Sequence, residues 1–465
     1  MTDPGTRTKR PILVFSILVT AIGYSFFTFC TQSGRQISND FAHSYLSAQA
    51  VRRHINPYEP EQLARLAEIY HYKGTAFPHV YPPFVSTILF FPFTLLQYPT
   101  ALNLWFWCSI LFLYGSFALL FLLVKQVSSV RGQEAFSPDA FLLLSFAAFL
   151  IFFYPFSENF RWAQINLLIL VVLILFLYFL LNDKAILAGL CLSVIILIKI
   201  APVLFWLYLL FKRKYRMALF TLIFLTVLSF ASVAIMGTDH VRFYIEKVLP
   251  TLSFGKAVYG APDMIAGYYG NYSLNSFFSS LFVESVLGNQ IPWRNPALGK
   301  LLYYAVSFIL LGDTLVRSTR EQKAESKPYA LLQLSHIVIL YSLISSITFE
   351  HHLVSLCIPL TVIGLQFVHK KPTRLWIAFY VISWVVLSLN VEKIYFQPAF
   401  SFYMKHIAFS ANRAVLSYLF LLALPMKMYA MILLWACGRK AERSLALEKQ
   451  NEENKNGRPC SSCSS

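Results

Sequence analysis

The sequence predicts an all-α protein that crosses a membrane about 11–13 times. Only 13% of its residues are charged and 57% are hydrophobic, whereas soluble domains carry roughly 25% charged residues. Apolar runs long enough to cross about 30 Å of hydrocarbon recur along the chain. These runs lack the period-2 alternation of a membrane barrel, so the crossing elements are helices.

The apolar runs place the expected membrane-spanning helices in order along the chain. We expect them at residues 11–30, 101–124, 139–155, 165–182, 185–211, 217–236, 299–316, 329–347, 353–368, 375–390 and 414–437. Two regions stay open. The run 84–98 is short and carries Pro92, which suits a short span or a re-entrant segment, and 185–211 forms either one helix or two that break at Pro202.

The basic residues orient these helices. The formal charge is +17, and the Lys and Arg residues gather between apolar runs, which is typical of cytoplasmic loops rather than of nucleic-acid binding. Residues 9–10, 212–216, 317–327, 370–374 and 439–443 are therefore expected inside. Two long loops, 31–82 and 237–298, are then expected outside, on the periplasmic or extracellular face of the plasma membrane, and long ordered loops usually carry function.

The chain is expected to form a single membrane domain over residues 1–443. The polar segment 444–465 is expected to be a disordered cytoplasmic tail. The seven cysteines show no disulfide framework, and a lone pair such as Cys460 and Cys463 is weak evidence for zinc.

The first outer loop holds a candidate general base. Ser38 or Asn39 can cap a short helix that ends before Pro57. Asp40 and His43 then lie three residues apart on one face. The helix dipole favours an ionised carboxylate in the first turn, which can accept a proton from a hydroxyl group. A plain capping role for Asp40 is the alternative.

Further polar residues follow at the ends of other apolar runs. Glu158 and Arg161 can form an ion pair just before Gln164 and Asn166. Lys199 stands inside an apolar stretch, where a cation is costly and suggests function unless its side chain reaches the interface. The motif Glu350-His351-His352 suits hydrogen bonding to an anionic phosphate better than metal binding, because adjacent histidines face different sides of a helix. Asn271 lies in the second outer loop.

Five short motifs, in the same order, resemble glycosyltransferase family 87, whose members have the GT-C fold and include mycobacterial polyprenol-phosphate-mannose-dependent α-mannosyltransferases. They are the first-loop residues 40–58 with Tyr81-Pro82-Pro83, then Gln164 with Asn166, the Lys199 segment, the stretch 271–274, and 350–354. Ala163 stands where the family has a glycine, and Phe349 where it often has Trp.

The resemblance implies an inverting hexosyltransferase that moves a sugar, mannose or another hexose, from a polyprenyl-phosphate donor to a lipid or glycan acceptor. Asp40 would be the catalytic base, without cofactor or obligatory metal. Membrane lipid surrounds the protein, and no nucleic acid is involved. The expected donor-phosphate residues are Lys199, His351 and His352, with Arg52 and Arg53 as further candidates. The expected sugar and acceptor residues are His43, Tyr81, Gln164, Asn166, Asn271 and Glu350.

Two other classes remain open at this point. A secondary transporter or lipid flippase would need polar residues deep in several spans, and Lys199 and His336 are the main cases here. An O-antigen ligase or polymerase also has many spans and a large outer loop. It would use arginines and a histidine in one late loop, whereas the acidic motif here lies early, at Asp40.

Overall fold

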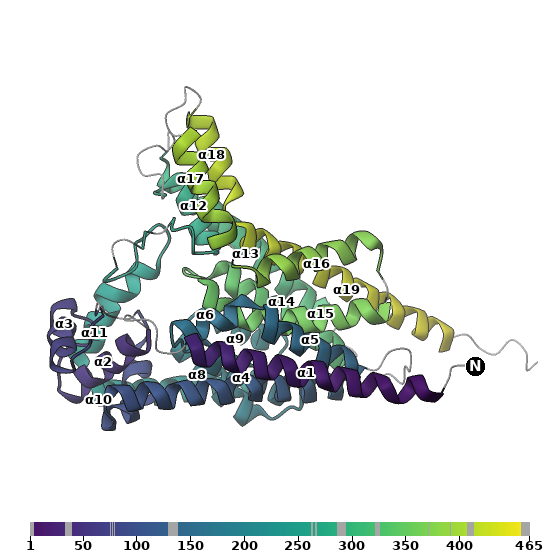
Figure 1. The fold of residues 1–465 in the computed structure, drawn as a ribbon, viewed down its shortest axis with the longest axis horizontal. Helices are drawn as coiled ribbons and strands as arrows, with labels where there is room; N and C mark the ends of the chain where they lie inside the picture. The colour runs from purple at the N-terminus through teal and green to yellow at the C-terminus, as the bar shows by residue number, and fades with distance from the viewer. Residues whose placement is uncertain are drawn as a thin grey trace, which may run out of the picture.

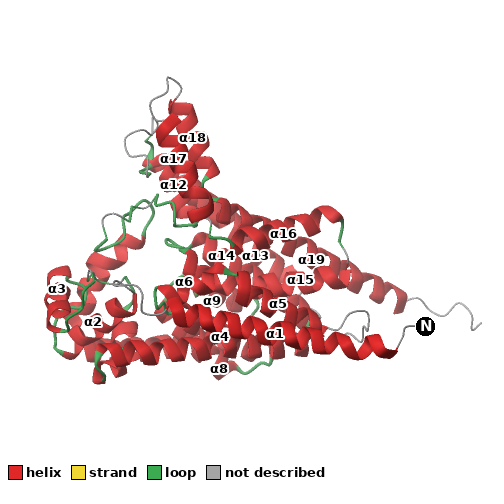
Figure 2. Cartoon of the chain, in the orientation of Figure 1, coloured by secondary structure: helices red, strands yellow, loops and turns green. Residues whose placement is uncertain are grey.

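The computed structural model is helical throughout the part of the chain that it describes (Figure 2). It describes residues 4–32, 40–74, 76, 78, 80–128, 138–261, 264–265, 267–285, 294–320, 326–370, 372–390, 392–406 and 413–456. Within these residues the β-structure is limited to an isolated bridge between Val258 and Ala261. The prediction of an all-α protein is therefore confirmed.

Five helical segments are each long and apolar enough to cross a membrane. They are α4 (Tyr98–Ser128), α10 (Tyr215–Met236), α13 (Pro296–Arg320), α14 (Lys327–Ile344), and η8 (Glu350–Leu356) continued by α15 (Cys357–Lys370). In Figure 1, α4 and α10 run along the long axis of the molecule. The apolar windows of α14 and α15 are 89% buried but that of α10 is only 17% buried. Since all three are apolar, α14 and α15 form the core of the bundle and α10 presents most of its surface to lipid.

Three bent helix pairs raise the count of candidate spans to eight. They are α5 (Pro138–Phe152) with α6 (Tyr154–Arg161), α16 (Arg374–Ser388) with η9 (Glu392–Phe396) and α17 (Gln397–His406), and α18 (Arg413–Ala423) with α19 (Met426–Asn456). Shorter apolar segments lie in α1 (Pro4–Gln32), α7 (Asn166–Leu181) and α8 (Ala185–Ile198). The multi-pass membrane character is thus supported, while the expected 11–13 crossings stay a prediction.

Prolines explain where the helices differ from the apolar runs. The run 84–98 forms two short irregular helices, η1 (Val85–Leu89) and η2 (Phe91–Leu95), with Pro92 at the start of the second. The run 185–211 is split, because α8 ends before Pro202 and α9 (Val203–Phe211) follows it. The expected span 414–437 is not one straight helix, since α18 and α19 meet at Pro425 with a 54° bend. Proline lacks the N–H group that a continuous helix needs.

The expected disordered tail begins too early. α19 continues to Asn456, because the segment after residue 444 is rich in Ala, Leu, Glu and Lys, which favour helix. Cys460 and Cys463 lie outside the described residues.

The two long loops contain short helices of their own. The first loop holds α2 (Asp40–Arg52) and α3 (Pro60–Ile69). The second loop holds α11 (Thr238–Phe243), η4 (Tyr244–Val248), η5 (Leu249–Leu252) and α12 (Leu274–Phe282). In Figure 1, α2, α3 and α11 lie together at the end of the molecule opposite the N-terminus. α12 lies apart from them, beside α17 and α18 (Figure 1).

Candidate functional site

Asp40 begins helix α2 and is held there by the corner that follows α6. Its backbone N–H donates to the carbonyl oxygen of Trp162 at 3.0 Å. Its side chain is 32% exposed, and Nδ1 of the buried His43 lies 3.5 Å from Oδ1. The carboxylate is thus fixed from one side and still reached by solvent. Ser38 and Asn39, the expected caps, lie outside the described residues.

A tight corner joins α6 to α7 and presents Gln164 and Asn166. Ala163 has a φ of 51°, a left-handed conformation that glycine adopts most easily. The following residue, Gln164, is buried, and its Oε1 accepts hydrogen bonds from the Tyr81 hydroxyl and from Asn166 Nδ2, both at 3.3 Å. The left-handed turn therefore points two predicted amide side chains toward the first outer loop.

Lys199 occupies the break between α8 and α9. Its backbone is extended, with φ −139° and ψ 131°, so the chain leaves the helix at this residue. Its Nζ donates to Asn166 Oδ1 at 2.7 Å. The helix break places the Lys199 ammonium group beside Asn166, the first residue of α7. The predicted functional lysine is therefore hydrogen-bonded to one of the predicted amide side chains.

The histidine pair lies in the irregular helix η8. The rings of His351 and His352 are 4.5 Å apart between centroids and nearly perpendicular, at 84°. Nδ1 of His352 accepts a hydrogen bond from the backbone N–H of Phe349 at 3.1 Å. Nδ1 also lies 3.2 Å from the carbonyl oxygen of Ile347, to which it donates in the other tautomer. In the tautomer that accepts at Nδ1 the proton is on Nε2, from which His352 can then donate.

These residues share one electrostatic neighbourhood. The charge of Asp40 acts on Lys199, His351 and Tyr81, and the charge of Lys199 acts on both histidines. Burial raises the pKa of the Tyr81 phenol far above its usual value, and the Asp40 charge raises it further. Tyr81 is therefore a neutral hydrogen-bond donor beside an acidic group. We call Asp40, Tyr81, Gln164, Asn166, Lys199, His351 and His352 the polar cluster.

Arg52 and Arg53 are not brought to the polar cluster. They lie at the other end of α2, about 18 Å from Asp40 at 1.5 Å per helical residue. Arg52 Nη1 donates to the carbonyl oxygen of Thr94 at 2.7 Å. The guanidinium of Arg53 packs over the ring of Tyr70 and donates to its hydroxyl. Arg52 is therefore engaged with η2, and Arg53 is engaged within the first outer loop.

Glu350 is held by the protein itself and does not face the polar cluster as a free carboxylate. It forms a buried ion pair with Lys427 in α19, a side chain with no exposed surface. Its Oε2 also accepts a hydrogen bond from the Tyr272 hydroxyl at 3.2 Å. Lys427 Nζ donates in addition to the carbonyl oxygen of Leu387 at 3.1 Å. The pair therefore ties the start of η8 to α16, α19 and the second outer loop.

The side chain of Asn271 also binds groups of the protein itself, in this case backbone groups. Its Oδ1 accepts from the N–H groups of Thr348 and Ser273, at 2.8 and 3.3 Å, and its Nδ2 donates to the carbonyl oxygen of Ser346 at 3.1 Å. With its amide occupied in this way, Asn271 positions the segment that leads into Phe349 and the histidines.

Two charged residues of this region were missing from the predicted site. Glu158 is buried and accepts hydrogen bonds from Arg161 at 2.9 Å, from Trp162 Nε1 at 2.7 Å and from Tyr154. It therefore anchors the corner whose Trp162 carbonyl holds Asp40. Lys427 carries the same sequence signal as Lys199, a cation within an apolar run, and that signal could have found it.

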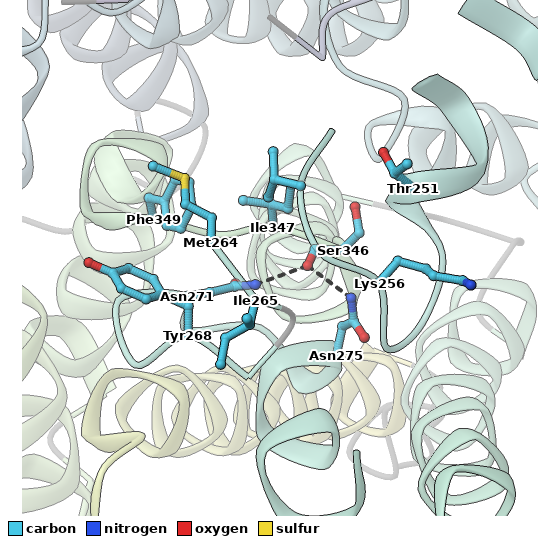
Figure 3. Close-up of a pocket in the computed structure, with 11 residues that line it drawn as sticks. Thr251, Lys256, Met264, Ile265, Tyr268, Asn271, Asn275, Ser346, Ile347 and Phe349 are labelled. Carbon is cyan, nitrogen blue, oxygen red and sulfur yellow. Dashed lines mark hydrogen bonds between the residues drawn. The ribbon is translucent and has the colours of Figure 1, made fainter. Parts of the chain in front are cut away.

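A small surface pocket lies beside Phe349, next to the polar cluster (Figure 3). Phe349 forms part of its wall, and the same ring contacts both histidines, at 5.9 and 5.6 Å between centroids. Figure 3 shows Asn271 and Asn275 pointing to the carbonyl oxygen of Ser346, to which each donates at 3.1 Å. The rest of the wall is Thr251, Lys256, Val258, Met264, Ile265, Tyr268 and Ile347. In the described part of the chain, no three His, Cys, Asp or Glu side chains gather as metal ligands would.

Comparison with known proteins points to one family. The sequence model of glycosyltransferase family 87 matches residues 79–348. A polyprenol-phosphate-mannose-dependent alpha-(1-2)-phosphatidylinositol pentamannoside mannosyltransferase of Mycobacterium tuberculosis is 24% identical over 322 residues, which are 67% of this chain and 70% of that protein. A polyprenol-phosphate-mannose-dependent alpha-(1-2)-phosphatidylinositol mannoside mannosyltransferase of Mycolicibacterium smegmatis is 27% identical over 289 residues, 61% of each chain.

Proposed function

Because the chain belongs to glycosyltransferase family 87, and is therefore a membrane glycosyltransferase of the GT-C class, we propose that it transfers mannose from a polyprenyl-phosphate donor to a hydroxyl group of a glycolipid acceptor. Both relatives are named for this donor and for phosphatidylinositol mannoside acceptors. The reaction takes place at the membrane face that carries the two long loops, which is the outer face of the plasma membrane.

The observation that carries this proposal is a set of linked contacts: the Asp40 backbone binds the Trp162 carbonyl, and from the same corner Gln164 and Asn166 lead by hydrogen bonds to Lys199. Asp40 and Lys199 also lie within electrostatic reach of His351 in η8. A base and a cationic anion-binding group must both lie at the reacting carbon for an in-line displacement. Asp40, Lys199 and His351 are the side chains that we propose for these two roles.

Asp40 is the general base. As the acceptor oxygen forms its bond to the anomeric carbon, its proton passes to the Asp40 carboxylate, while the bond from that carbon to the phosphate oxygen breaks. A single displacement inverts the configuration of the carbon. The side chain is 32% exposed, so the proton can then leave to solvent, and His43 holds the carboxylate in place from the buried side.

The leaving group is a lipid phosphate, which needs charge stabilisation rather than a strong acid. Lys199 offers a point charge, and His351 and His352 offer hydrogen-bond donors where negative charge develops on the departing oxygens. Asn166 fixes the direction of the Lys199 ammonium through its 2.7 Å hydrogen bond. Preorganised donors of this kind are worth the most where water is scarce.

Tyr81, Gln164 and Asn166 orient the sugar. They form a chain of hydrogen bonds at 3.3 Å whose donors and acceptors come from two different loops. A hydroxyl group of a hexose can take the place of one of these hydrogen-bond partners, so that every buried polar group keeps a hydrogen bond. The same residues would accept glucose or arabinose, so the sugar must be identified by experiment.

The deciding experiment uses the purified full-length protein in liposomes. Polyprenyl-phosphate mannose, glucose and arabinose are supplied, each radiolabelled, together with a mannosylated phosphatidylinositol acceptor. Transfer of the mannose label to the acceptor is expected, and Asp40→Asn should slow it by about 10²–10⁴-fold. Transfer of only another sugar would overturn the donor assignment, and unchanged transfer by Asp40→Asn would overturn the assignment of the base.

A further inference from the structure

The helices α17 and α18, with η9, form a projecting unit that we call the outer hairpin, residues 393–406 and 413–423. The helical segment Lys393–His406 makes an angle of 91° with α16, and α18 makes an angle of 54° with α19. In Figure 1 the hairpin points away from the bundle, across the direction of α4 and α10. Since α4 and α10 are long enough to cross the bilayer, the hairpin runs closer to the plane of the membrane than to its normal.

One side of the outer hairpin is packed against its own helices and α12. Tyr403 and Leu421 are buried together with Leu281 of α12. The Tyr403 hydroxyl shares a hydrogen bond of 2.6 Å with Ser417 Oγ. This packing gives the hairpin a fixed shape, so its other surfaces have defined directions.

The opposite side is apolar and uncovered. Val415, Leu419 and Leu422 of α18 recur at the spacing of one helical stripe and are 65%, 56% and 41% exposed. On α17, Phe402 is 58% exposed. A helix that is apolar on both its packed and its free side is not suited to water.

The charge of the hairpin matches an anionic membrane surface. Between Lys393 and Ala423 the sequence contains Lys and Arg but neither Asp nor Glu. Lys393 and Lys405 are exposed. Basic residues beside an apolar face are the composition of helices that lie in the boundary between lipid headgroups and acyl chains.

The hairpin is joined through α12 to a helix of the bundle that also exposes apolar side chains. Leu301 and Phe308 of α13, a candidate span, are 65% and 68% exposed, and α12 contacts both α13 and α18. α12, whose residues are buried or half-buried, therefore joins a membrane-crossing helix with an exposed apolar surface to the hairpin.

We propose that the outer hairpin lies flat in the headgroup–acyl boundary of the leaflet nearest the polar cluster, with Phe402, Val415 and Leu419 in lipid. The ring of Phe396, in η9, stacks on Tyr269 of the second outer loop at 3.4 Å and 4°. Tyr269 follows Tyr268, which lines the pocket beside the histidines. The hairpin thereby holds that loop at headgroup level, where a lipid-borne acceptor presents its polar end.

The depth of the hairpin can be measured without any sugar substrate. Single nitroxide labels are placed by Phe402→Cys, Val415→Cys and Leu419→Cys in a cysteine-free full-length protein, in liposomes of phosphatidylethanolamine and phosphatidylglycerol. Accessibility to oxygen, which enters lipid, is compared with accessibility to a water-soluble nickel chelate. Glu61→Cys, on the exposed face of α3, is the matched control in the first outer loop.

Labels at 402, 415 and 419 should favour oxygen severalfold over nickel, and the label at 61 should favour nickel. Nickel accessibility at 402 and 419 equal to that at 61 would overturn the proposal. Exclusion of both reagents would also overturn it, since a second protein surface would then cover the face. The readout is independent of the proposed mannosyl transfer, so either proposal can fail while the other stands.

Discussion

The ammonium group of Lys199 donates a 2.7 Å hydrogen bond to Oδ1 of Asn166. The two residues are 33 positions apart, one at the break between α8 and α9 and the other at the first residue of α7. Asn166 is buried, and its amide in turn reaches Gln164 and, through it, Tyr81. The pair therefore joins a cation to the amide chain on which the proposed sugar site depends.

Replacing Lys199 with Met should weaken donor use. Hydrogen bonds to a charged group contribute roughly 1.5–3 kcal/mol, so kcat/KM for the polyprenyl-phosphate donor should fall by about 10- to 150-fold. Lys184→Met, an exposed lysine at the turn before α8, is the control and should retain wild-type kinetics. Equal kinetics for the two variants would remove Lys199 from the phosphate site.

Replacing Asp40 with Asn should act on the chemical step. A positioned general base contributes about 10²–10⁴-fold to the rate, so kcat should fall by that factor while the KM for donor changes little. Asn also keeps the shape of the side chain and its ability to contact His43. A large rise in donor KM at unchanged kcat would instead assign Asp40 to binding. Steady-state kinetics in liposomes separates the two outcomes.

Removing Lys427 should destabilise the fold. Lys427→Met leaves the Glu350 carboxylate buried without its cation, which costs about 3–5 kcal/mol, and should lower the apparent unfolding temperature in detergent. Glu350→Gln in the same chain should restore much of that loss, because the buried charge is then gone.

The single variant Glu350→Gln separates a structural role from sugar binding. A structural role predicts lower stability with little change in KM for donor or acceptor. Unchanged stability with a raised KM would return Glu350 to the sugar site.

Ala163 should accept glycine and reject valine. A non-glycine residue in the left-handed region destabilises the folded state by roughly 1–2 kcal/mol. Glycine avoids this strain but lowers stability by about 0.5–1 kcal/mol, because it gives the unfolded chain more conformational freedom. Ala163→Gly should therefore be neutral or slightly stabilising. Ala163→Val should be destabilising, because a β-branched side chain fits this backbone poorly. Thermal unfolding of both variants tests the turn, and a valine variant as stable as wild type would contradict the left-handed conformation.

Much of the fold could be predicted from the sequence because each part rests on local chemistry. A long apolar run must form a helix to cross a membrane, and a proline such as Pro202 interrupts that helix. The cation at 199 and the acid at 40 were likewise recognisable, since each is unusual for its surroundings. Pro425 also predicts a helix break, although 414–437 was expected to form one helix. Lys427, just after it, is a cation within an apolar run, as Lys199 is.

The roles of Arg52, Glu350 and Asn271 could not be predicted this way, because each depends on partners far along the chain. Arg52 donates to Thr94, Glu350 pairs with Lys427, and Asn271 binds the backbone near Thr348. Motif order placed these residues in the right loops, but a loop can turn a side chain toward a substrate or into its own support. Local sequence determined that this chain is a bundle of membrane helices with a polar cluster at one end. Only the tertiary structure decided which polar groups remain available for chemistry, since a buried charge or amide must first be satisfied by its neighbours.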